Sequence, residues 1–360
     1  MPAGGTIIHL SYPPRVTVVV VNWNRRELLR ACLESLAAQQ HTSYEVKVID
    51  NGSTDGSTEL VRNMRETFPV VLDLIENDHN RGFCAANNQG IAASHAEFVA
   101  LLNNDAEAEP GWLAALEDAM RSAGDVGMVA SKILVWQDPS SKDPARIDKV
   151  GHLIYPDGQN RGRGAGEIDR GQYDRVEETL WPDGCAAMYR RAMLDEIGGF
   201  DEDFFAYADD AELGMRGRIA GWRSLYAPGA RVRHHRGASL GLGSARRLTL
   251  IERNRVLLVV KLFPWNLIWL NGAHYATRIA GGLWAAIRNR GEIRRYSGTT
   301  GKLSAAMALL WGTVSALPRI PRMLRKRREF AAKRRLTPRQ IRDLLRKYRI
   351  PLKEISEQAT

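Results

Sequence analysis

Apolar runs alternate with amphipathic helix patterns along the first third of the chain. The patterns predict strands at 16–21, 45–49, 70–75 and 98–102, each followed by a helix, near 28–36, 58–66, 85–93 and 112–119. Strands that alternate with helices predict an α/β fold in which a mostly parallel, Rossmann-like sheet is flanked by helices. The ligand crevice of such a sheet lies outside the carboxyl ends of its strands.

Small polar residues fall where these strands end. Asn22 and Asn24 follow the first strand, Asp50 ends the second, and an Asn-Asn-Asp triplet at 103–105 directly follows the fourth. Alternate residues of an extended segment share a face, so the first and last members of the triplet point the same way. A carboxylate beside a neutral oxygen suits a hard divalent cation that also holds phosphates. The same residue types make ordinary turns and caps, and each cluster alone leaves both interpretations open.

A third polar loop precedes the predicted helix at 85–93. Arg81 stands in an Asn-Arg-Gly triplet and Asn87 lies within the following run. A guanidinium fork suits phosphate oxygens, so one interpretation puts both residues near a diphosphate or a base. The other is a plain loop and helix start.

The alternation of strand and helix patterns stops between residues 124 and 189. This stretch is rich in Gly, Asp and Pro, which predicts loops and short antiparallel strands. Helix patterns resume at 190–197 and 209–220, and the second begins with Asp209 and Asp210, a placement that is also good capping chemistry. His234 and His235 follow a short predicted strand, and imidazole is a common metal ligand.

The composition of the chain bears on its cellular compartment and on its partners. At 360 residues and 44% hydrophobic, the chain can bury one large domain with appendages. Its three cysteines, Cys32, Cys84 and Cys185, are in neither disulfide nor zinc spacing, which favours a reducing compartment. The N-terminus does not have the pattern of a signal peptide. The formal charge of +10 gathers at 319–349, where fourteen Lys and Arg face two acids, a net of +12.

The C-terminal third is rich in Trp, Leu and basic residues. Polar residues interrupt its first apolar stretch before the ~20 apolar residues of a spanning helix accumulate, and the second, 303–317, is too short. We therefore predict helices that lie in the plane of an anionic membrane surface. The alternative is that they pack on the α/β domain or make a dimer. The chain is divided accordingly into an extension (1–14), an α/β domain (15–250) and a helical, basic region (251–360).

The polar clusters, taken in order, resemble a known family. The motifs are VNWN, DNGSTDGS, NRGFxxANNxG, LLNNDA, DGCAAM, GGFDE, DDxEL and VxHH, spread over residues 15–250. Together they resemble the family 2 inverting glycosyltransferases of the GT-A fold, and most closely the rhamnosyltransferase-like branch that builds bacterial surface polysaccharides.

The resemblance implies a function and a set of site residues. A sugar, with rhamnose suggested by the branch, would pass from a nucleoside-diphosphate sugar to a hydroxyl of a lipid-linked or polysaccharide acceptor. Asp210 would be the general base, and Asp105 and His234 would hold Mn²⁺ or Mg²⁺. The nucleotide sugar would lie among Asn22, Asn24, Asp50, Arg81, Asn87, Asn103 and Asn104. The acceptor would face Asp183, Gly184, Cys185 and Asp209.

The chain departs from the family pattern at two positions. Asn103 stands where the first Asp of the DXD metal motif would be, which leaves the strength of metal binding open. Asp209 replaces the Glu of the motif that carries the base. An inverting transfer needs no covalent intermediate, so no nucleophilic Ser or Cys is expected. The resemblance further implies a peripheral protein on the cytoplasmic face of the plasma membrane, without a nucleic-acid partner and with its oligomeric state open.

Two other classes of function stay in view. A nucleotidyltransferase also holds phosphates on an α/β sheet, but it would show a Gly-rich, basic loop after the first strand, where this chain has Asn-Trp-Asn-Arg. A nucleic-acid-binding protein would use the basic run for phosphate contacts, which explains nothing before residue 250.

Overall fold

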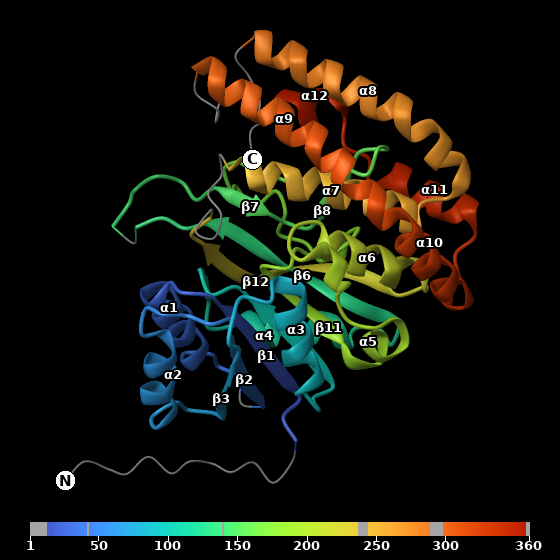
Figure 1. Cartoon of the computed structure of the whole chain (residues 1–360). Coiled ribbons are helices and arrows are strands. Elements are labelled where there is room, and N and C mark those ends of the chain that lie inside the picture. Colours follow the sequence, from blue (N-terminus) through green and yellow to red (C-terminus); the bar gives the residue numbers. More distant parts are fainter. Residues whose placement is uncertain (1–12, 42, 139, 237–243, 289–297, 358–360) are drawn as a thin grey trace, which may run out of the picture.

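The computed structural model describes residues 13–41, 43–138, 140–236, 244–288 and 298–357 (Figure 1). Its N-terminal part alternates strands and helices as predicted. The elements are β1 (Val16–Asn22), α1 (Arg26–Ala37), β2 (Tyr44–Asp50), α2 (Ser57–Arg65), β3 (Leu72–Glu76), α3 (Phe83–Ala92), β4 (Phe98–Leu102), β5 (Ala106–Ala108) and α4 (Trp112–Arg121).

The strands form one mixed sheet with the main order β10-β12-β6-β11-β4-β1-β2-β3. β1 pairs in parallel with β2 and β4, β2 pairs in parallel with β3, and the reversed strand β11 separates β4 from β6. The predicted α/β fold with a mostly parallel sheet is confirmed. The remaining strands are β6 (Val126–Val135), β7 (Ile147–Lys149), β8 (His152–Ile154), β9 (Asn160–Gly162), β10 (Glu177–Glu178), β11 (Ala186–Arg190) and β12 (Arg223–His234).

The prediction of only loops and short strands between 124 and 189 was wrong at its beginning. β6 is a ten-residue strand, almost wholly buried, that pairs in parallel with the twelve-residue β12. Strands buried on both faces read as continuous apolar runs. Gly127, Ser131 and Lys132 break that run in the sequence, and Lys132 is buried because its ammonium pairs with Asp169 and Asp174. The short strands β7 to β10 fit the prediction.

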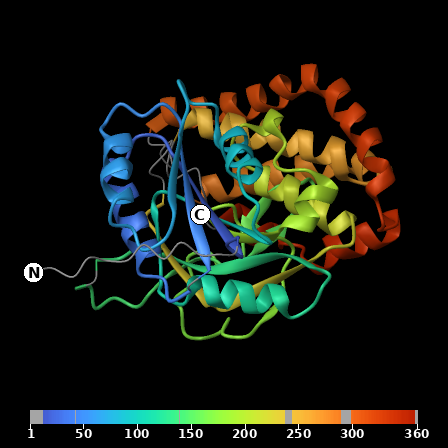
Figure 2. The same cartoon turned by 90° about the horizontal axis from the view of Figure 1, so that it is seen from below.

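Helices cover both faces of the sheet. Along β1, Val18 and Val20 join the core under α1, α2 and α4, while Val19 joins the core of the opposite face, as the two-residue period of a strand requires. That opposite core is covered by α3 and by α5 (Arg191–Ile197), α6 (Asp209–Ile219) and α7 (Ala245–Leu262). Figure 2 shows α1 and α2 in blue on the side away from the orange and red C-terminal helices.

The C-terminal region is helical and part of it belongs to the second core. Its helices are α8 (Trp265–Ile287), α9 (Gly298–Ala316), α10 (Ile320–Glu329), α11 (Pro338–Lys347) and α12 (Leu352–Glu357). Met323 of α10 and Ile341 of α11 are buried with residues of α5 and α6. The boundary at 250 therefore falls inside α7, in a helix packed on the catalytic part.

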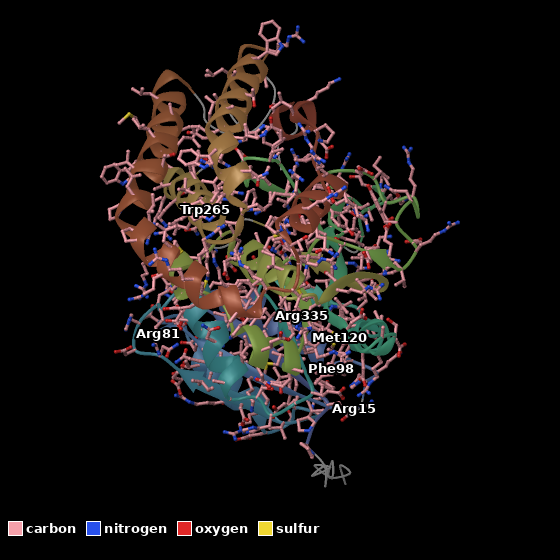
Figure 3. The ribbon with its side chains drawn as sticks, turned by 90° about the vertical axis from the view of Figure 1, so that its right-hand side faces the viewer. Arg15, Arg81, Phe98, Met120, Trp265 and Arg335 are labelled. Carbon is pink, nitrogen blue, oxygen red and sulfur yellow. The ribbon has the colours of Figure 1, made fainter. Side chains whose placement is uncertain are left out.

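Part of the basic run docks these helices. Arg327 is buried and donates to the carbonyl oxygen of Phe263 at 2.6 Å, and Lys326 pairs with Asp201 and Asp203. Arg335 reaches Glu196 at 2.8 Å; Figure 3 labels this arginine among the side chains. For these residues the structure favours packing on the catalytic part. Other basic side chains face solvent, among them Arg325, Arg328, Lys333, Arg339, Arg346 and Arg349.

α8 and α9 instead expose apolar side chains. Trp269 is 85% exposed and Trp311 is 63% exposed, and Trp265 stands at the start of α8 (Figure 3). The second apolar stretch is longer than predicted because the helix continues through a 3₁₀ turn into α10. Among the described residues, this run, Leu303–Lys333, has the length and composition of a membrane span, with a mean hydropathy of 1.3 over its most apolar window. One such helix is weak evidence for a span.

The packing of α3 on β1 yields a stability prediction. A Cβ on Gly90 would overlap the Val19 side chain, whereas a Cβ on Gly124 would meet no atom within 4 Å. We expect Gly90→Ala to lower the free energy of unfolding by about 1–3 kcal/mol, as overpacking usually does. Urea denaturation compares it with Gly124→Ala, which should change little. Equal stability of the two variants would contradict this packing.

Candidate functional site

A hydrogen-bonded polar network joins the ends of three neighbouring strands. The Asn22 amide, at the end of β1, donates to Asp50 at 2.9 Å and accepts from Asn104 at 2.7 Å. Asp50, at the end of β2, also accepts from the hydroxyl of Ser53 at 2.6 Å. Asn22 and Asp50 are both buried. The network fixes the strand ends against one another and presents the triplet that follows β4.

A cavity of about 780 Å³ lies beside these strand ends. Its wall comes from the loops after β1, β2 and β4, from the β7–β9 segment, from the starts of α3 and α6, and from α7, α8 and α9. Nine of the fourteen predicted site residues line it: Asn103, Asn104, Asp105, Asp183, Gly184, Cys185, Asp209, Asp210 and His234.

The other five predicted residues do not line the cavity. Asn22 and Asp50 are buried in the network, and Asn87 is buried with its amide donated to the Phe83 carbonyl oxygen at 2.9 Å. Asn24 accepts from the backbone N–H of Thr54 at 2.9 Å. Arg81 is exposed (Figure 3). Asn22, Asn24, Asp50 and Asn87 thus make hydrogen bonds within the strand ends, the following loops and α3. The neighbours that reach the cavity in their place are Trp23, Arg25, Asn51 and Asn80.

One cluster of charged side chains in the cavity centres on His234. Its Nε2 lies 3.3 Å from Oδ1 of Asp105, and its Nδ1 lies 2.8 Å from Oδ2 of Asp148. Arg236 lies 3.1 Å from the other oxygen of Asp148. Burial opposes ionisation, but the contacts with His234 outweigh it and hold the pKa of Asp105 below its usual range. His235 does not line the cavity and stacks on Trp136, with ring centroids 4.4 Å apart.

The residues Asp105 and His234 fit a divalent cation. Oδ1 of Asp105 is buried without a hydrogen-bond partner, and a carboxylate oxygen and an imidazole nitrogen meet at the cavity wall. Asn103, which also lines the cavity, adds a neutral oxygen of the kind such ions accept. Asp148 orients the imidazole from behind, as partners of metal-binding histidines do.

A second cluster of charged side chains lies at the start of α6. His152 Nε2 is 3.0 Å from Oδ2 of Asp183 and 3.3 Å from Oδ2 of Asp210. Lys149 Nζ lies 2.6 Å from the same oxygen of Asp183. Asp209 is buried, and the side chain of Asp210 is 12% exposed and lines the cavity.

The carboxyl groups of this second cluster differ in proton affinity. Burial, together with the charge of Asp210, raises the pKa of Asp209 well above its ordinary value. Burial also raises the pKa of Asp210, against the opposing effects of His152 and Lys149. The pKa of Asp183 falls well below its usual range because the charge of Lys149 and the bond to His152 outweigh its burial. Groups whose environments push their pKa values apart are typical of acid–base sites.

The second cluster could also be read as a metal site. One ligand atom each of His152, Asp183 and Asp210 lie within 4.8 Å of one another. However, Lys149 already places a positive charge 2.6 Å from Asp183. A cation bound there would have to compete with that ammonium.

The loop before α6 is held in a strained conformation. Phe205, Tyr207 and Ala208 have φ angles of 63°, 69° and 54°, values that cost free energy in residues other than glycine. The amide of Asn254, a buried residue of α7, donates to the carbonyl oxygens of Phe204, Ala206 and Tyr207 at 2.7–2.9 Å. The first turn of the presumed C-terminal region therefore shapes the loop that presents Asp209 and Asp210.

Sequence reasoning missed Asp148, Lys149, His152 and Asn254. The first three lie on β7 and β8. Their only signal in the sequence was the short spacing of Asp, Lys and His among apolar residues. Asn254 sits in a helix pattern among charged residues, where nothing in the sequence shows that it is buried.

Comparisons with known proteins agree with this geometry. A model of "Glycosyl transferase family 2" matches residues 17–198. An N-acetylglucosaminyl-diphospho-decaprenol L-rhamnosyltransferase of Mycobacterium tuberculosis is 30% identical over 247 residues, 64% of this chain and 79% of that protein. The O-antigen biosynthesis protein RfbC of Myxococcus xanthus is 28% identical over 63% of this chain. The chain spans only 18% of RfbC and 25% of another relative.

A solved structure supports the fold. The mannosyltransferase PcManGT of Pyrobaculum calidifontis, solved with GDP-Man and Mn²⁺, superposes with a TM-score of 0.52 at 21% identity, over 90% of this chain and 86% of that one.

The sheet and the superposition show the GT-A fold, and the family match shows that the chain is a glycosyltransferase. The chain belongs to glycosyl transferase family 2, in its rhamnosyltransferase-like branch. Relatives with this domain act in glycan synthesis, and the membership decides against nucleotidyl transfer or nucleic-acid binding as the main activity.

The strained loop yields a prediction for Asn254. Asn254→Ala removes an amide NH2 group that contacts three carbonyl oxygens and an oxygen that accepts from Arg253, so we expect the free energy of unfolding to fall by about 1–3 kcal/mol. The turnover number should fall roughly tenfold or more, because the loop no longer fixes Asp210. The thermal shift induced by the sugar-nucleotide donor should persist.

The control is Asn63→Ala, an exposed position of α2. Steady-state kinetics on the folded fraction separates positioning from stability. A turnover number within twofold of the wild type for Asn254→Ala would contradict the positioning role.

Proposed function

We propose that this chain is an inverting, metal-dependent glycosyltransferase. It moves a sugar from a nucleoside-diphosphate sugar to a hydroxyl of a lipid-linked acceptor in bacterial surface-glycan synthesis. One observation carries the proposal: a cation-binding pair, Asp105 and His234, and a carboxylate of raised pKa, Asp210, line the same cavity. The cation-binding pair suits a leaving diphosphate, and the carboxylate of raised pKa suits a reacting hydroxyl.

The donor is proposed to lie at the ends of β1, β2 and β4. Asn51 and Asn104 offer amides at the cavity wall, and Arg25 offers a guanidinium suited to phosphate or base. Trp23 is 44% exposed there and presents a ring on which a base can stack. Asp105 and His234 would hold Mn²⁺ or Mg²⁺, which when bound would stabilise the charge of the leaving diphosphate.

Asp210 is proposed as the general base. It takes the proton of the acceptor hydroxyl while that oxygen attacks the anomeric carbon and the diphosphate leaves from the opposite face. The raised pKa gives its carboxylate more proton affinity than an exposed Asp has. His152 lies 3.3 Å from its carboxylate, and Asp183 positions that imidazole through a 3.0 Å contact with the same ring nitrogen. Asp183, Gly184, Cys185 and Asp209 form the proposed acceptor side.

The acceptor class and location rest on the relatives and on the surface. The Mycobacterium relative is named for a diphospho-decaprenol acceptor. The exposed tryptophans of α8 and α9, and the exposed basic residues of α10 and α11, fit a protein held at an anionic membrane leaflet. We assign it to the cytoplasmic face of the plasma membrane as a peripheral protein. Rhamnose is the proposed sugar.

The base assignment is tested by Asp210→Asn. The variant should keep the fold and the donor-induced thermal shift but lose roughly 10²-fold or more in turnover. A base works only when deprotonated, so wild-type turnover should fall as the pH falls. Because the pKa of Asp210 is raised, this acidic limb should lie above the ordinary Asp value of 3.8.

The matched control is Asp118→Asn on the exposed face of α4. Release of nucleoside diphosphate measures turnover. Normal turnover in Asp210→Asn would exclude Asp210 as the base.

The metal assignment is tested by removing one ligand at a time. Asp105→Ala and His234→Ala should weaken donor binding in the presence of Mn²⁺ and abolish its dependence on Mn²⁺. His235→Ala should change little, because His235 pairs with Glu107 outside the cavity. Titration calorimetry of the donor with and without metal measures this. Full activity in excess chelator would rule out the metal role.

A further inference from the structure

The cavity continues beyond the proposed reaction site, and its far part is apolar. Its wall there is made by α7, α8, α9 and α12. The apolar lining residues are Leu248, Ile251, Ile279, Leu283, Ala305, Ala306, Leu309, Leu310 and Ile355. No part of the proposed transfer chemistry uses these side chains. A wall of this kind in a cavity that also contains Asp210 suits a ligand with a polar head and an apolar tail.

A neutral ion-pair network between α7 and α8 contributes to the cavity wall. Glu252 of α7 accepts from Arg255 at 2.7 Å and from Arg278 of α8 at 2.9 Å. Asp157 pairs with Arg278 too, and both guanidinium groups lie over the ring of Tyr275, at 4.7 and 5.3 Å. Two carboxylates balance two guanidinium groups, so the network joins α7 to α8 without a net charge. It fixes the wall of the cavity where its lining changes from polar to apolar.

The apolar part reaches the molecular surface. Leu283 of α8 and Leu310 of α9 line the cavity, yet they are 62% and 59% exposed. Their neighbours Trp284 and Trp311 are 55% and 63% exposed. The cavity thus opens onto an exposed apolar surface on α8 and α9, the helices that Figure 1 shows above α7. Contiguous exposed apolar surface marks a site of interaction.

We propose that the apolar part of the cavity binds the polyprenyl chain of the acceptor next to its diphosphate. This inference rests on the proposed function and names the place of the lipid. The acceptor sugar then lies near Asp210, the diphosphate lies between, and the first isoprene units lie among Ile251, Ile279 and Leu309. The rest of the chain leaves past Leu283 and Leu310 into the membrane.

The size of the cavity fits this arrangement. Its volume of about 780 Å³ must also hold the donor, so it cannot enclose a long prenyl chain. An opening lined by apolar residues removes the difficulty, because the distal chain stays in the lipid. The occupant is therefore amphiphilic and long, rather than a soluble oligosaccharide.

Two glycines of α8 give a matched pair of test variants. A Cβ on Gly282 or on Gly272 meets no atom within 4 Å, so a larger side chain fits at both positions. Gly282 lines the cavity and Gly272 does not. Phe has a higher helix propensity than Gly, so neither substitution should weaken the helix. Gly282→Phe narrows the apolar part, while Gly272→Phe adds the same ring elsewhere on α8.

The experiment measures binding of decaprenyl diphosphate and of inorganic diphosphate to the full chain in detergent micelles. Wild type and Gly272→Phe should bind the long-chain probe at least tenfold more tightly than inorganic diphosphate, which has no isoprene unit to fill the apolar part. Gly282→Phe should lose that preference and keep its affinity for the nucleotide-sugar donor. An unchanged preference in Gly282→Phe, or an equal loss in both variants, would overturn the lipid site in the cavity.

Transfer assays keep the two proposals distinct. If the long-chain probe binds with the Gly282 dependence but no sugar is transferred to a polyprenyl-diphosphate-linked saccharide, the acceptor class of the proposed function fails while the lipid site stands. If sugar is transferred but the rate and the KM for that acceptor are the same in Gly282→Phe and wild type, the lipid site fails and the proposed function stands.

Discussion

Burial of carboxylates at one edge of the sheet is the constraint on which the site depends. Asp105, Asp148, Asp183 and Asp209 are all buried, and charges removed from water need partners. His234 and Arg236 serve the first two. The second cluster has Lys149 and His152 for three carboxyl groups, counting Asp210, so part of its charge is not compensated. The raised pKa of Asp210, on which the proposed base depends, follows from its burial, which outweighs the effects of His152 and Lys149.

At the same edge of the sheet, the C-terminal helices contact the proposed reaction site. A backbone with three positive φ angles before α6 needs external support, and Asn254 of α7 supplies it. One turn earlier, Leu248 and Ile251 of the same helix line the apolar part of the cavity. α7 therefore contacts the loop of the proposed base on one side and the proposed lipid path on the other. Residue 250, the predicted domain boundary, lies within this helix.

The sequence allowed the fold and the polar part of the cavity wall at the strand ends to be predicted, for physical reasons. Strand–helix alternation and the order of polar clusters are local signals, and nine predicted residues line the cavity. The strand β6 was missed because Gly127, Ser131 and Lys132 interrupt its apolar run. Asn22 and Asp50 were placed at the right strand ends, but their side chains pair with each other inside the wall. Lys149 and His152 could not be predicted, because long-range packing alone brings them to Asp183.

The stereochemistry of the transfer tests the account most directly. With Asp210 as a base on the acceptor and no nucleophile between donor and acceptor, the sugar is displaced once. The one-bond coupling between C1 and H1 of the transferred sugar, measured by NMR in the product and in the donor, reports the anomeric configuration of each. The account predicts opposite configurations. A product that keeps the configuration of the donor would contradict it.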